Sequence, residues 1–337
     1  MKAIEITEPG KIRIIEKPTP VPNENEALLK VRCGGICGAD VASYTGNQPF
    51  TTYPRIPGHE FSARIVSLPE GTAGFAVGDI ITCNPYFNCG KCYACRRGLV
   101  NACHDNRTMG VQRDGAFQEY ITMPVDRLIC GKGLSARELA LIEPFSISCH
   151  ALSRAQIRPG DNLLIMGAGP IGLFALLRAK SLGAKVLIAD MLPSRLHLAK
   201  TYGADMAVNV KEENLHDACV SFTLGNGFDV CVEACGAPET FLNCIEEAAH
   251  GANIILIGNG KRETTFVHSI LLKKELNVFG CRNAFTRDFE TLIDLVAAGK
   301  VNVLNMVSGV YAMEDAAVAF EKLKNNDGSL AKLLIEF

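Results

Sequence analysis

One group of residues that could do chemistry is a run of four closely spaced cysteines. They follow the pattern C-x2-C-x2-C-x7-C and are Cys89, Cys92, Cys95 and Cys103. Four thiolates close a tetrahedron around a zinc ion and leave no position for water or substrate, so an ion bound here would fold the loop rather than react. A redox pair or an iron–sulfur cluster is the competing interpretation. The spacing favours a structural zinc site over residues 89–103.

A second, sparser set of possible metal ligands comes from separate segments of the chain. They are Cys37, the adjacent His59 and Glu60, and Glu143. A mixture of sulfur, nitrogen and oxygen donors is typical of a catalytic zinc, which keeps one position open for water or a substrate oxygen. We expect Asp40 to accept the other imidazole N–H of His59 and so to fix the tautomer of that ring. The sequence leaves open whether Glu60 or Glu143 binds the metal directly.

A glycine-rich turn between a predicted strand and a predicted helix indicates a dinucleotide site. The segment Gly167-Ala168-Gly169-Pro170-Ile171-Gly172 follows a strand expected over 163–166 and opens a helix expected over 171–182. The glycines allow a tight turn, close approach of a pyrophosphate and packing of the helix on the strand, and the helix N-terminus attracts phosphate. Asp190 ends the next predicted strand and is placed to accept hydrogen bonds from a ribose. Because its carboxylate would repel a 2′-phosphate, we expect NAD rather than NADP.

Two kinds of local pattern indicate the domains that position these residues. Up to about residue 145, short strand-like runs alternate with turns, which predicts an irregular, strand-rich domain. From about residue 150, continuous apolar strands alternate with helical segments, which is typical of a doubly wound parallel sheet. We therefore predict an α/β protein. Its catalytic domain would contain residues 1–149 and 286–337, and its nucleotide-binding domain residues 150–285.

The composition favours a small-molecule partner. The 337 residues are 48% hydrophobic and carry a formal net charge of −2, with Lys and Arg scattered along the chain, so we expect neither nucleic-acid nor membrane binding. The N-terminus carries early charges and no apolar signal core, and we expect a cytoplasmic protein. In that reducing compartment, the fourteen cysteines would be thiols or metal ligands.

With these motifs, the chain resembles the zinc-containing medium-chain dehydrogenases along essentially its full length. Besides both ligand sets and the glycine-rich turn, the shared motifs are Pro57-Gly58-His59-Glu60-Phe61, Gly115-Ala116-Phe117-Gln118-Glu119-Tyr120 and Ile142-Glu143-Pro144-Phe145. The resemblance implies a GroES-like catalytic domain, a Rossmann domain, two zinc ions per subunit, and reversible oxidation of an alcohol to a ketone with NAD. Glu143 stands where liver-type alcohol dehydrogenases carry a cysteine ligand, which points to the sorbitol, threonine and sugar-acid branch.

A finer likeness is to the hexonate dehydrogenases, which oxidise L-galactonate or L-gulonate. It rests on Gly46-Asn47-Gln48-Pro49-Phe50, Gly110-Val111-Gln112-Arg113-Asp114-Gly115 and Arg282-Asn283-Ala284. In the polyol relatives an arginine matching Arg282 contacts substrate oxygens, and a guanidinium can clamp a carboxylate or a polyol edge. The same likeness implies substrate contacts from Asn283, Phe50 and Phe117. A surface or inter-domain salt bridge is the alternative role for Arg282.

The resemblance also implies further nucleotide contacts and an assembly. Arg195 would flank the adenosine, Glu233 would line the nucleotide crevice, and Lys332 matches a basic residue that touches the pyrophosphate. Relatives form dimers or tetramers, so we expect a homodimer or a homotetramer. An apolar strand over 252–257 would suit such an assembly at the edge of a sheet.

The chain departs from its relatives where a proton would leave the active site. Relatives often carry Ser or Thr two residues after the cysteine ligand and His three residues further on, whereas this chain has Ala39 and Ala42. One interpretation is a relay through a carboxylate beside the metal, with Ser43 or Tyr44 nearby; another is a different substrate. The alternative functions are a sorbitol- or threonine-type dehydrogenase, and a catalytically weak regulatory protein that binds zinc and nucleotide.

Overall fold

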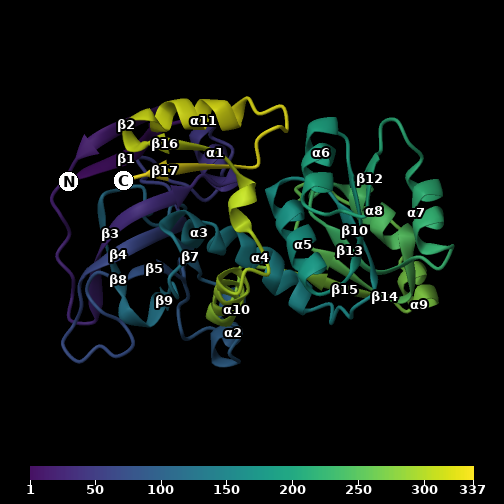
Figure 1. The fold of residues 1–337 in the computed structure, drawn as a ribbon, viewed down its shortest axis with the longest axis horizontal. Helices are drawn as coiled ribbons and strands as arrows, with labels where there is room; N and C mark the ends of the chain where they lie inside the picture. The colour runs from purple at the N-terminus through teal and green to yellow at the C-terminus, as the bar shows by residue number, and fades with distance from the viewer. The chain divides into compact units, whose positions relative to one another are not determined.

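The structure is a computed structural model that describes all of residues 1–337, and it divides into two compact units. The first unit contains Met1–Ser146, Asn283–Asn326 and Leu330–Phe337. The second contains Ile147–Arg282 and Asp327–Ser329. Both chain ends belong to the first unit, as the N and C labels show (Figure 1). The sequence analysis placed the boundaries three residues later at each of the two main crossings, at 149/150 and 285/286.

A seven-stranded sheet is the framework of the first unit. Six strands follow the order β16-β17-β3-β4-β5-β9, and β8 pairs with β3 off this path. The strands are β3 (Glu26–Gly35), β4 (Glu60–Ser67), β5 (Ile80–Cys83), β8 (Tyr120–Pro124), β9 (Leu128–Cys130), β16 (Val307–Ala312) and β17 (Lys332–Glu336). Two small sheets pair β1 (Lys2–Glu8) with β2 (Lys11–Glu16) and β6 (Tyr86–Phe87) with β7 (Arg107–Thr108). Because β17 pairs antiparallel with β3, the C-terminal tail is part of this sheet.

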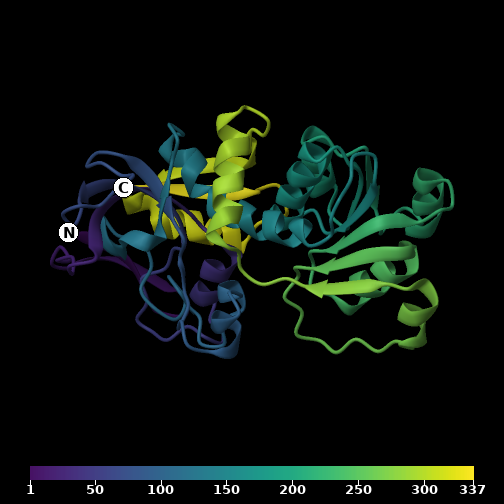
Figure 2. The ribbon, with the colours of Figure 1, turned by 90° about the horizontal axis from the view of Figure 1, so that it is seen from below.

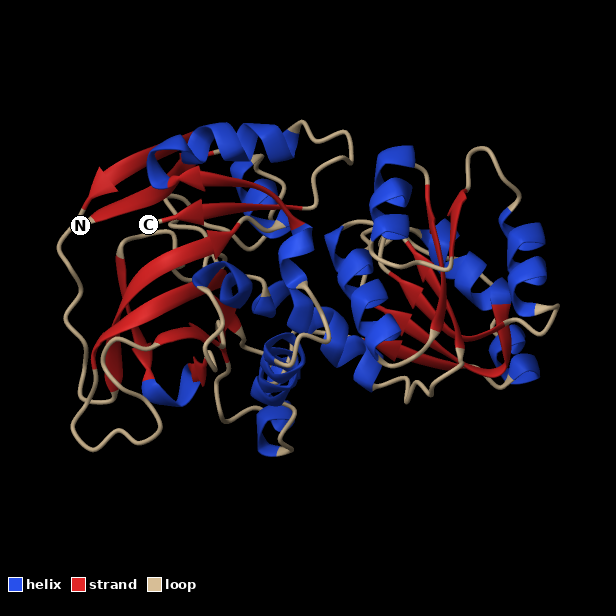
Figure 3. Ribbon diagram, in the orientation of Figure 1, coloured by secondary structure: helices blue, strands red, loops and turns tan.

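Helices are few and mostly short in the first unit (Figure 3). They are α1 (Gly38–Tyr44), α2 (Tyr93–Arg96), α3 (Ala136–Ala140), α10 (Thr286–Ala297) and α11 (Ala316–Lys324), and α4 (Ile142–Ser153) begins in this unit and ends in the second. One core cluster centres on Phe117 and Phe320, whose rings meet edge to face at 6.4 Å between centroids. Burial of such apolar side chains supplies most of the driving force for folding. The strand-rich character predicted for this part of the chain is confirmed.

The second unit is a doubly wound sheet, as the sequence predicted. Its six strands are all parallel and follow the order β12-β11-β10-β13-β14-β15, which is the Rossmann arrangement. The strands are β10 (Asn162–Met166), β11 (Lys185–Asp190), β12 (Met206–Asn209), β13 (Phe228–Glu233), β14 (Ala248–Leu256) and β15 (Asn277–Gly280). The helices are α5 (Pro170–Ser181), α6 (Pro193–Thr201), α7 (Leu215–Thr223), α8 (Pro238–Glu247) and α9 (Ser269–Lys274). The central strands are buried, which explains their continuous apolar sequences.

The strand predicted at 252–257 is not at the edge of this sheet, and that prediction is wrong. It belongs to β14, which lies between β13 and β15 (Figure 2). The edge strand β15 is only four residues long and leaves Val278 38% exposed, so it gives a weaker apolar signal in the sequence. None of the helices combines the length and the apolar character that crossing a bilayer requires.

Candidate active site

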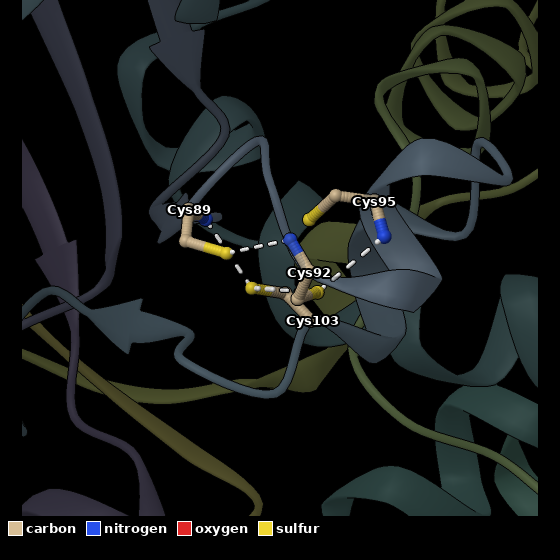
Figure 4. Close-up of side chains that lie close together, drawn as sticks. All are labelled: Cys89, Cys92, Cys95 and Cys103. Atoms are coloured by element: carbon tan, nitrogen blue, oxygen red, sulfur yellow. Dashed lines mark hydrogen bonds between the residues drawn. The ribbon is translucent and has the colours of Figure 1, made fainter.

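The four-cysteine loop gathers its sulfur atoms around one point. The four Sγ atoms lie within 4.8 Å of one another, and no disulfide joins them (Figure 4). Backbone N–H groups of the loop point at the sulfurs: Cys92 donates to the sulfur of Cys89 at 3.4 Å, and Cys95 to that of Cys92 at 3.5 Å. Backbone N–H donors, led by that of Cys95, lower the pKa of Cys92 to about 6. Backbone N–H donors also lower the pKa of Cys89, whereas burial raises the pKa of Cys103 to about 12, so the loop favours the zinc-binding thiolate form at two of its cysteines.

A second donor cluster forms where β3 ends and β4 begins. These strands pair antiparallel with Gly35 opposite Glu60, so Cys37, just after β3, faces His59, just before β4. The donor atoms of Cys37, His59 and Glu60 lie within 4.8 Å of one another. A Cβ at Gly35 would overlap the Glu60 carboxylate, which explains the glycine at this position. The structure thus brings together three of the four predicted catalytic ligands.

Asp40 holds the two ligand segments together. Its fully buried carboxylate accepts the N–H of Cys37 at 2.9 Å through Oδ2 and the N–H of Gly58 at 3.1 Å through Oδ1. The Nδ1 atom of His59 lies 3.9 Å from Oδ1, too far for the hydrogen bond that we predicted. Burial raises the pKa of Asp40, and these N–H donors oppose that shift. Asp40 therefore positions the ligands mainly through their backbone.

The donor cluster fits a divalent metal ion. Cys37, His59 and Glu60 offer sulfur, nitrogen and oxygen, which is a donor set that zinc accepts. The buried Nδ1 atom of His59 makes no hydrogen bond and lies 3.9 Å from Oδ1 of Asp40, so the donor set of the cluster is the observation that indicates a cation site.

Glu143 lies outside this three-residue cluster. It sits in the first turn of α4, is 3% exposed, and accepts a hydrogen bond at Oε1 from the hydroxyl of Tyr86. Burial raises the pKa of Glu143 to about 7; the nearby His59 opposes the shift, and the Glu60 carboxylate adds to it. Tyr86 was not among the predicted site residues, because a lone tyrosine fits no ligand pattern and only the fold places it beside Glu143.

Lys332 is a buried partner of the donor cluster. Its Nζ atom donates to the carboxylate of Glu60 and, at 3.1 Å, to the carbonyl of Ile36, and the residue is 3% exposed. Burial lowers the pKa of Lys332, but the nearby acidic groups of Glu60, Cys37 and Glu143 together outweigh that effect and the pKa is raised. We expected Lys332 to contact a pyrophosphate. In the structure the ammonium group of Lys332 instead forms an ion pair with Glu60, because β17 pairs with the end of β3 that lies next to Glu60.

The glycine-rich turn has the geometry expected of a phosphate-binding loop. Gly167 adopts a φ of +105°, and a Cβ at Gly172 would overlap the carbonyl oxygen of Gly167. Gly169 is the N-cap of α5, Pro170 begins the helix and Ile171 follows, and a Cβ at Gly169 would meet nothing within 4 Å. The turn therefore needs glycine at 167 and 172 for its own shape, and at 169 it leaves space for a ligand.

Asp190 and Arg195 lie beside this turn. Asp190 ends β11, is 8% exposed, and accepts the N–H of Ala168 at 2.8 Å through Oδ2. Its Oδ1 atom accepts the N–H groups of Met191 and Leu192 at 2.7 and 3.0 Å. The guanidinium of Arg195 is 3.5 Å from Oδ2. Asp190 thus couples the glycine-rich turn to the strand end where a ribose would lie.

Glu233 shapes a turn instead of presenting its carboxylate to a crevice. It is 2% exposed, and its Oε1 atom accepts the N–H groups of Cys235 and Gly236, both at 2.8 Å, and the hydroxyl of Thr240 at 2.6 Å. These bonds occupy the carboxylate, so Glu233 shapes the backbone turn after β13, and the lining of the nucleotide crevice by this turn stays a prediction.

The predicted substrate residues lie in different environments. Phe117 is fully buried, and its ring fills the space above Gly34 and Gly58, so the prediction that it contacts substrate is wrong. Phe50 is 65% exposed on the loop after α1. Asn283 donates to the carbonyl of Asn101 in the four-cysteine loop at 3.2 Å.

Arg282 precedes Asn283 in the chain but belongs to the second unit. It is the last residue of the segment Ile147–Arg282, and Asn283 is the first residue of the next segment of the first unit. The direction of its guanidinium toward a substrate stays a prediction.

The hydroxyls near Ala39 and Ala42 have other partners. The Oγ atom of Ser43 donates to the carbonyl of Ala39 at 3.1 Å and lies 2.8 Å from the hydroxyl oxygen of Thr51. The hydroxyl of Tyr44 donates to Glu321 on α11 at 2.6 Å. Both hydroxyls are therefore engaged in other contacts, and a relay through Glu60 or Glu143 stays a prediction.

Two family models match the chain. The model of the alcohol dehydrogenase GroES-like domain matches residues 23–132, and the zinc-binding dehydrogenase model matches residues 170–298. The first range includes Cys37, His59, Glu60 and the four-cysteine loop. The second begins within the glycine-rich turn and ends just after α10.

Individual relatives match nearly the whole chain. It is 35% identical to L-galactonate-5-dehydrogenase of Escherichia coli (strain K12), over 100% of this chain and 99% of that protein. It is 32% identical to sorbitol dehydrogenase of Bacillus subtilis (strain 168), over 99% and 97%. A solved structure, described as a short chain alcohol dehydrogenase (rspB) from Escherichia coli CFT073 complexed with NADH, matches with a TM-score of 0.93 and 30% identity, over 100% of this chain and 99% of that one.

Proposed function

Because the chain belongs to the zinc-binding dehydrogenases with a GroES-like domain, we propose that it oxidises a secondary alcohol of a sugar acid to a ketone, with NAD as hydride acceptor. The observation that carries the proposal is the sulfur, nitrogen and oxygen cluster of Cys37, His59 and Glu60, in which His59 and Glu60 are buried, with a second buried carboxylate, Glu143, in the same unit. A sorbitol- or threonine-type dehydrogenase is the alternative within the same family.

Several residues of the first unit have separate roles at the proposed metal site. Cys37, His59 and Glu60 would hold a zinc ion, which would supply Lewis-acid polarisation of a substrate hydroxyl. Asp40 fixes the backbone of both ligand segments. In the metal-free protein Lys332 balances the charge of Glu60, which would otherwise be an unpaired buried anion.

Glu143 is the proposed proton acceptor. Tyr86 occupies its Oε1 atom and leaves Oε2 to take a proton from the substrate hydroxyl. With Ala39 and Ala42 unable to carry a proton, this carboxylate replaces the relay that relatives use. We expect Glu143→Gln to lower kcat far more than it weakens NADH binding; equal losses in both would exclude the role.

NAD is the proposed cofactor of the second unit. The N-terminus of α5 presents free N–H groups to a pyrophosphate, and Gly169 leaves space for it. Asp190 would repel a 2′-phosphate, and a matching solved structure is complexed with NADH. A comparison of NAD with NADP as hydride acceptor tests this preference, and faster turnover with NADP would contradict it.

A carboxylate on the substrate is the finer part of the proposal. It is supported by 35% identity to an L-galactonate-5-dehydrogenase and by Arg282, which could clamp a carboxylate. The test is Arg282→Ala assayed with hexonates and with sorbitol. A loss confined to hexonates supports the carboxylate clamp, whereas equal losses favour a polyol dehydrogenase.

We also propose that the active protein is a homodimer or homotetramer, which light scattering after gel filtration would distinguish from a monomer. A regulatory protein with little catalytic activity is the second candidate function, because the chain lacks the relay residues at Ala39 and Ala42. It would be favoured by zinc-loaded protein that binds NADH but reduces no NAD with any hexonate or polyol.

A further inference from the structure

Tyr86 lies on β6, just before the four-cysteine loop, and its side chain contacts a carboxylate of the proposed catalytic centre. The residue is 6% exposed, and its hydroxyl donates to Oε1 of Glu143. A buried phenol and a buried carboxylate that share a hydrogen bond satisfy each other, so each restricts where the other can point. No ligand pattern in the sequence includes this tyrosine.

The backbone around Tyr86 is held on several sides. Its N–H donates to Oδ1 of Asn84 at 3.0 Å, and Arg127 donates to its carbonyl oxygen. The next ring along, that of Phe87, has Arg113 and Arg127 over it at 3.6 and 4.4 Å. Cations over an aromatic ring attract it, and more strongly where water is excluded. The phenol of Tyr86 therefore projects from a strand that is held by hydrogen bonds and cation–π contacts, and not from a free loop.

The same strand forms one end of the four-cysteine loop. β6 ends at Phe87, just before Cys89, and pairs with β7, which follows Cys103. Asn88 connects the support of β6 to the four-cysteine loop. Its Oδ1 atom accepts a hydrogen bond from Arg127 at 3.0 Å, and its Nδ2 atom donates one to the sulfur of Cys95 at 3.8 Å. The folded loop thus determines where β6, and with it the phenol of Tyr86, lies.

We propose that Tyr86 is a positioning residue that keeps Glu143 outside the donor cluster of Cys37, His59 and Glu60, so that Glu60 is the carboxylate ligand and Glu143 serves the substrate. Without the phenol, the Oε1 atom of Glu143 loses its hydrogen-bond donor, and a metal ion is then the best available partner for the carboxylate. The inference rests on the proposed function in that it concerns the same metal site. The inference goes beyond the proposed function because it assigns to Tyr86, a residue anchored beside the four-cysteine loop, the choice of whether Glu60 or Glu143 binds the metal.

The test is Tyr86→Phe, which removes only the hydroxyl, with Tyr93→Phe as the matched control. Tyr93 lies in the same loop but is 68% exposed. Cobalt is placed in the catalytic site, and its visible absorption bands report the ligand set. We expect Tyr86→Phe to shift these bands and to lower kcat roughly tenfold, as loss of one positioning contact does. Tyr93→Phe should leave both unchanged, and both variants should retain two metal ions per chain.

A double-mutant comparison shows whether Tyr86 acts through Glu143. In a Glu143→Gln background, Tyr86→Phe should change the cobalt bands no further, because the group that it positions is already altered. Cobalt bands identical to those of the unmodified protein in Tyr86→Phe would overturn the proposal. A shift of equal size in the Glu143→Gln background would also overturn it.

A second variant covers the case in which Tyr86→Phe fails to fold. Asn88→Ala removes the contacts to Arg127 and Cys95 and leaves the phenol intact. It should shift the cobalt bands in the same direction by a smaller amount, and unchanged bands would overturn the link to the loop. Because the bands need no substrate, a shift in protein that oxidises no alcohol would reject the proposed function and leave the inference standing.

Discussion

Replacing Lys332 with methionine measures what the buried ion pair with Glu60 contributes to the first unit. The side chains of Lys332 and Glu60 are 4% and 1% exposed, and the other contact of the ammonium group is the carbonyl of Ile36. Methionine keeps most of the apolar stem but leaves Glu60 buried without a cation. Removing one partner of a buried pair costs about 3–5 kcal/mol, because an uncompensated charge stays behind.

We expect metal-free Lys332→Met to lose about 3–5 kcal/mol of unfolding free energy in urea denaturation. The double variant Lys332→Met with Glu60→Gln should recover most of this loss, because it removes both charges. Lys2→Met is the control: its ion pair with Glu314 is 2.8 Å long, but the side chains are 47% and 58% exposed. Such an exposed pair contributes little to stability, because water and salt screen the two charges.

Zinc provides a second arm of the same experiment. An ion bound by Cys37, His59 and Glu60 would replace the missing positive charge, so zinc should stabilise Lys332→Met more than it stabilises the unmodified protein. If Lys332→Met costs no more than Lys2→Met in the metal-free protein, the reasoning on the buried pair is refuted.

Three further predictions concern other parts of the chain. Gly172→Ala should weaken NADH binding at least tenfold in fluorescence titration, because the added methyl would overlap a carbonyl of the phosphate turn; unchanged affinity would contradict the assigned turn geometry. The pKa of His216 is raised by its hydrogen bond to Glu247, so the pair stabilises the fold below pH 6.5, the ordinary pKa, and this contribution is lost as the pH rises through the folded-state pKa. The stability difference between the unmodified protein and His216→Gln should therefore shrink with rising pH, and a difference that grows would refute the assignment. Cys103→Ser should release one zinc per chain and lower the melting temperature by several degrees, and full retention of zinc would argue against a four-thiolate site.

The sites that the sequence predicted best are local ones. Cys89 to Cys103 span a short loop, so their spacing alone constrains the donor geometry, and Gly167 to Gly172 carry both the turn and the start of the helix. The pattern of apolar segments likewise predicted the parallel sheet, because strands buried on both faces have continuous apolar sequences.

Contacts that depend on distant pairing could not be predicted in this way. Lys332 meets Glu60 only because the C-terminal strand β17 joins β3, and Tyr86 meets Glu143 only because β6 and α4 come together in the first unit. Phe117 lies in one of the motifs on which the predicted family resemblance rests, but the sequence does not reveal which face of that segment is buried. The glycines at 34 and 58 make room for its ring, a relation that only the fold shows.

Oxidation of a sugar acid by zinc-loaded protein is the most direct test of the central claim. The protein, with two zinc ions per chain confirmed, is mixed with NAD and a panel of hexonates and polyols, and NADH is followed by absorbance. Cys37→Ser is the matched variant, because it should keep the four-cysteine zinc and lose the catalytic one. The account predicts NADH formation with at least one hexonate and its loss in Cys37→Ser. No NADH with any substrate, or full activity in Cys37→Ser, would contradict it.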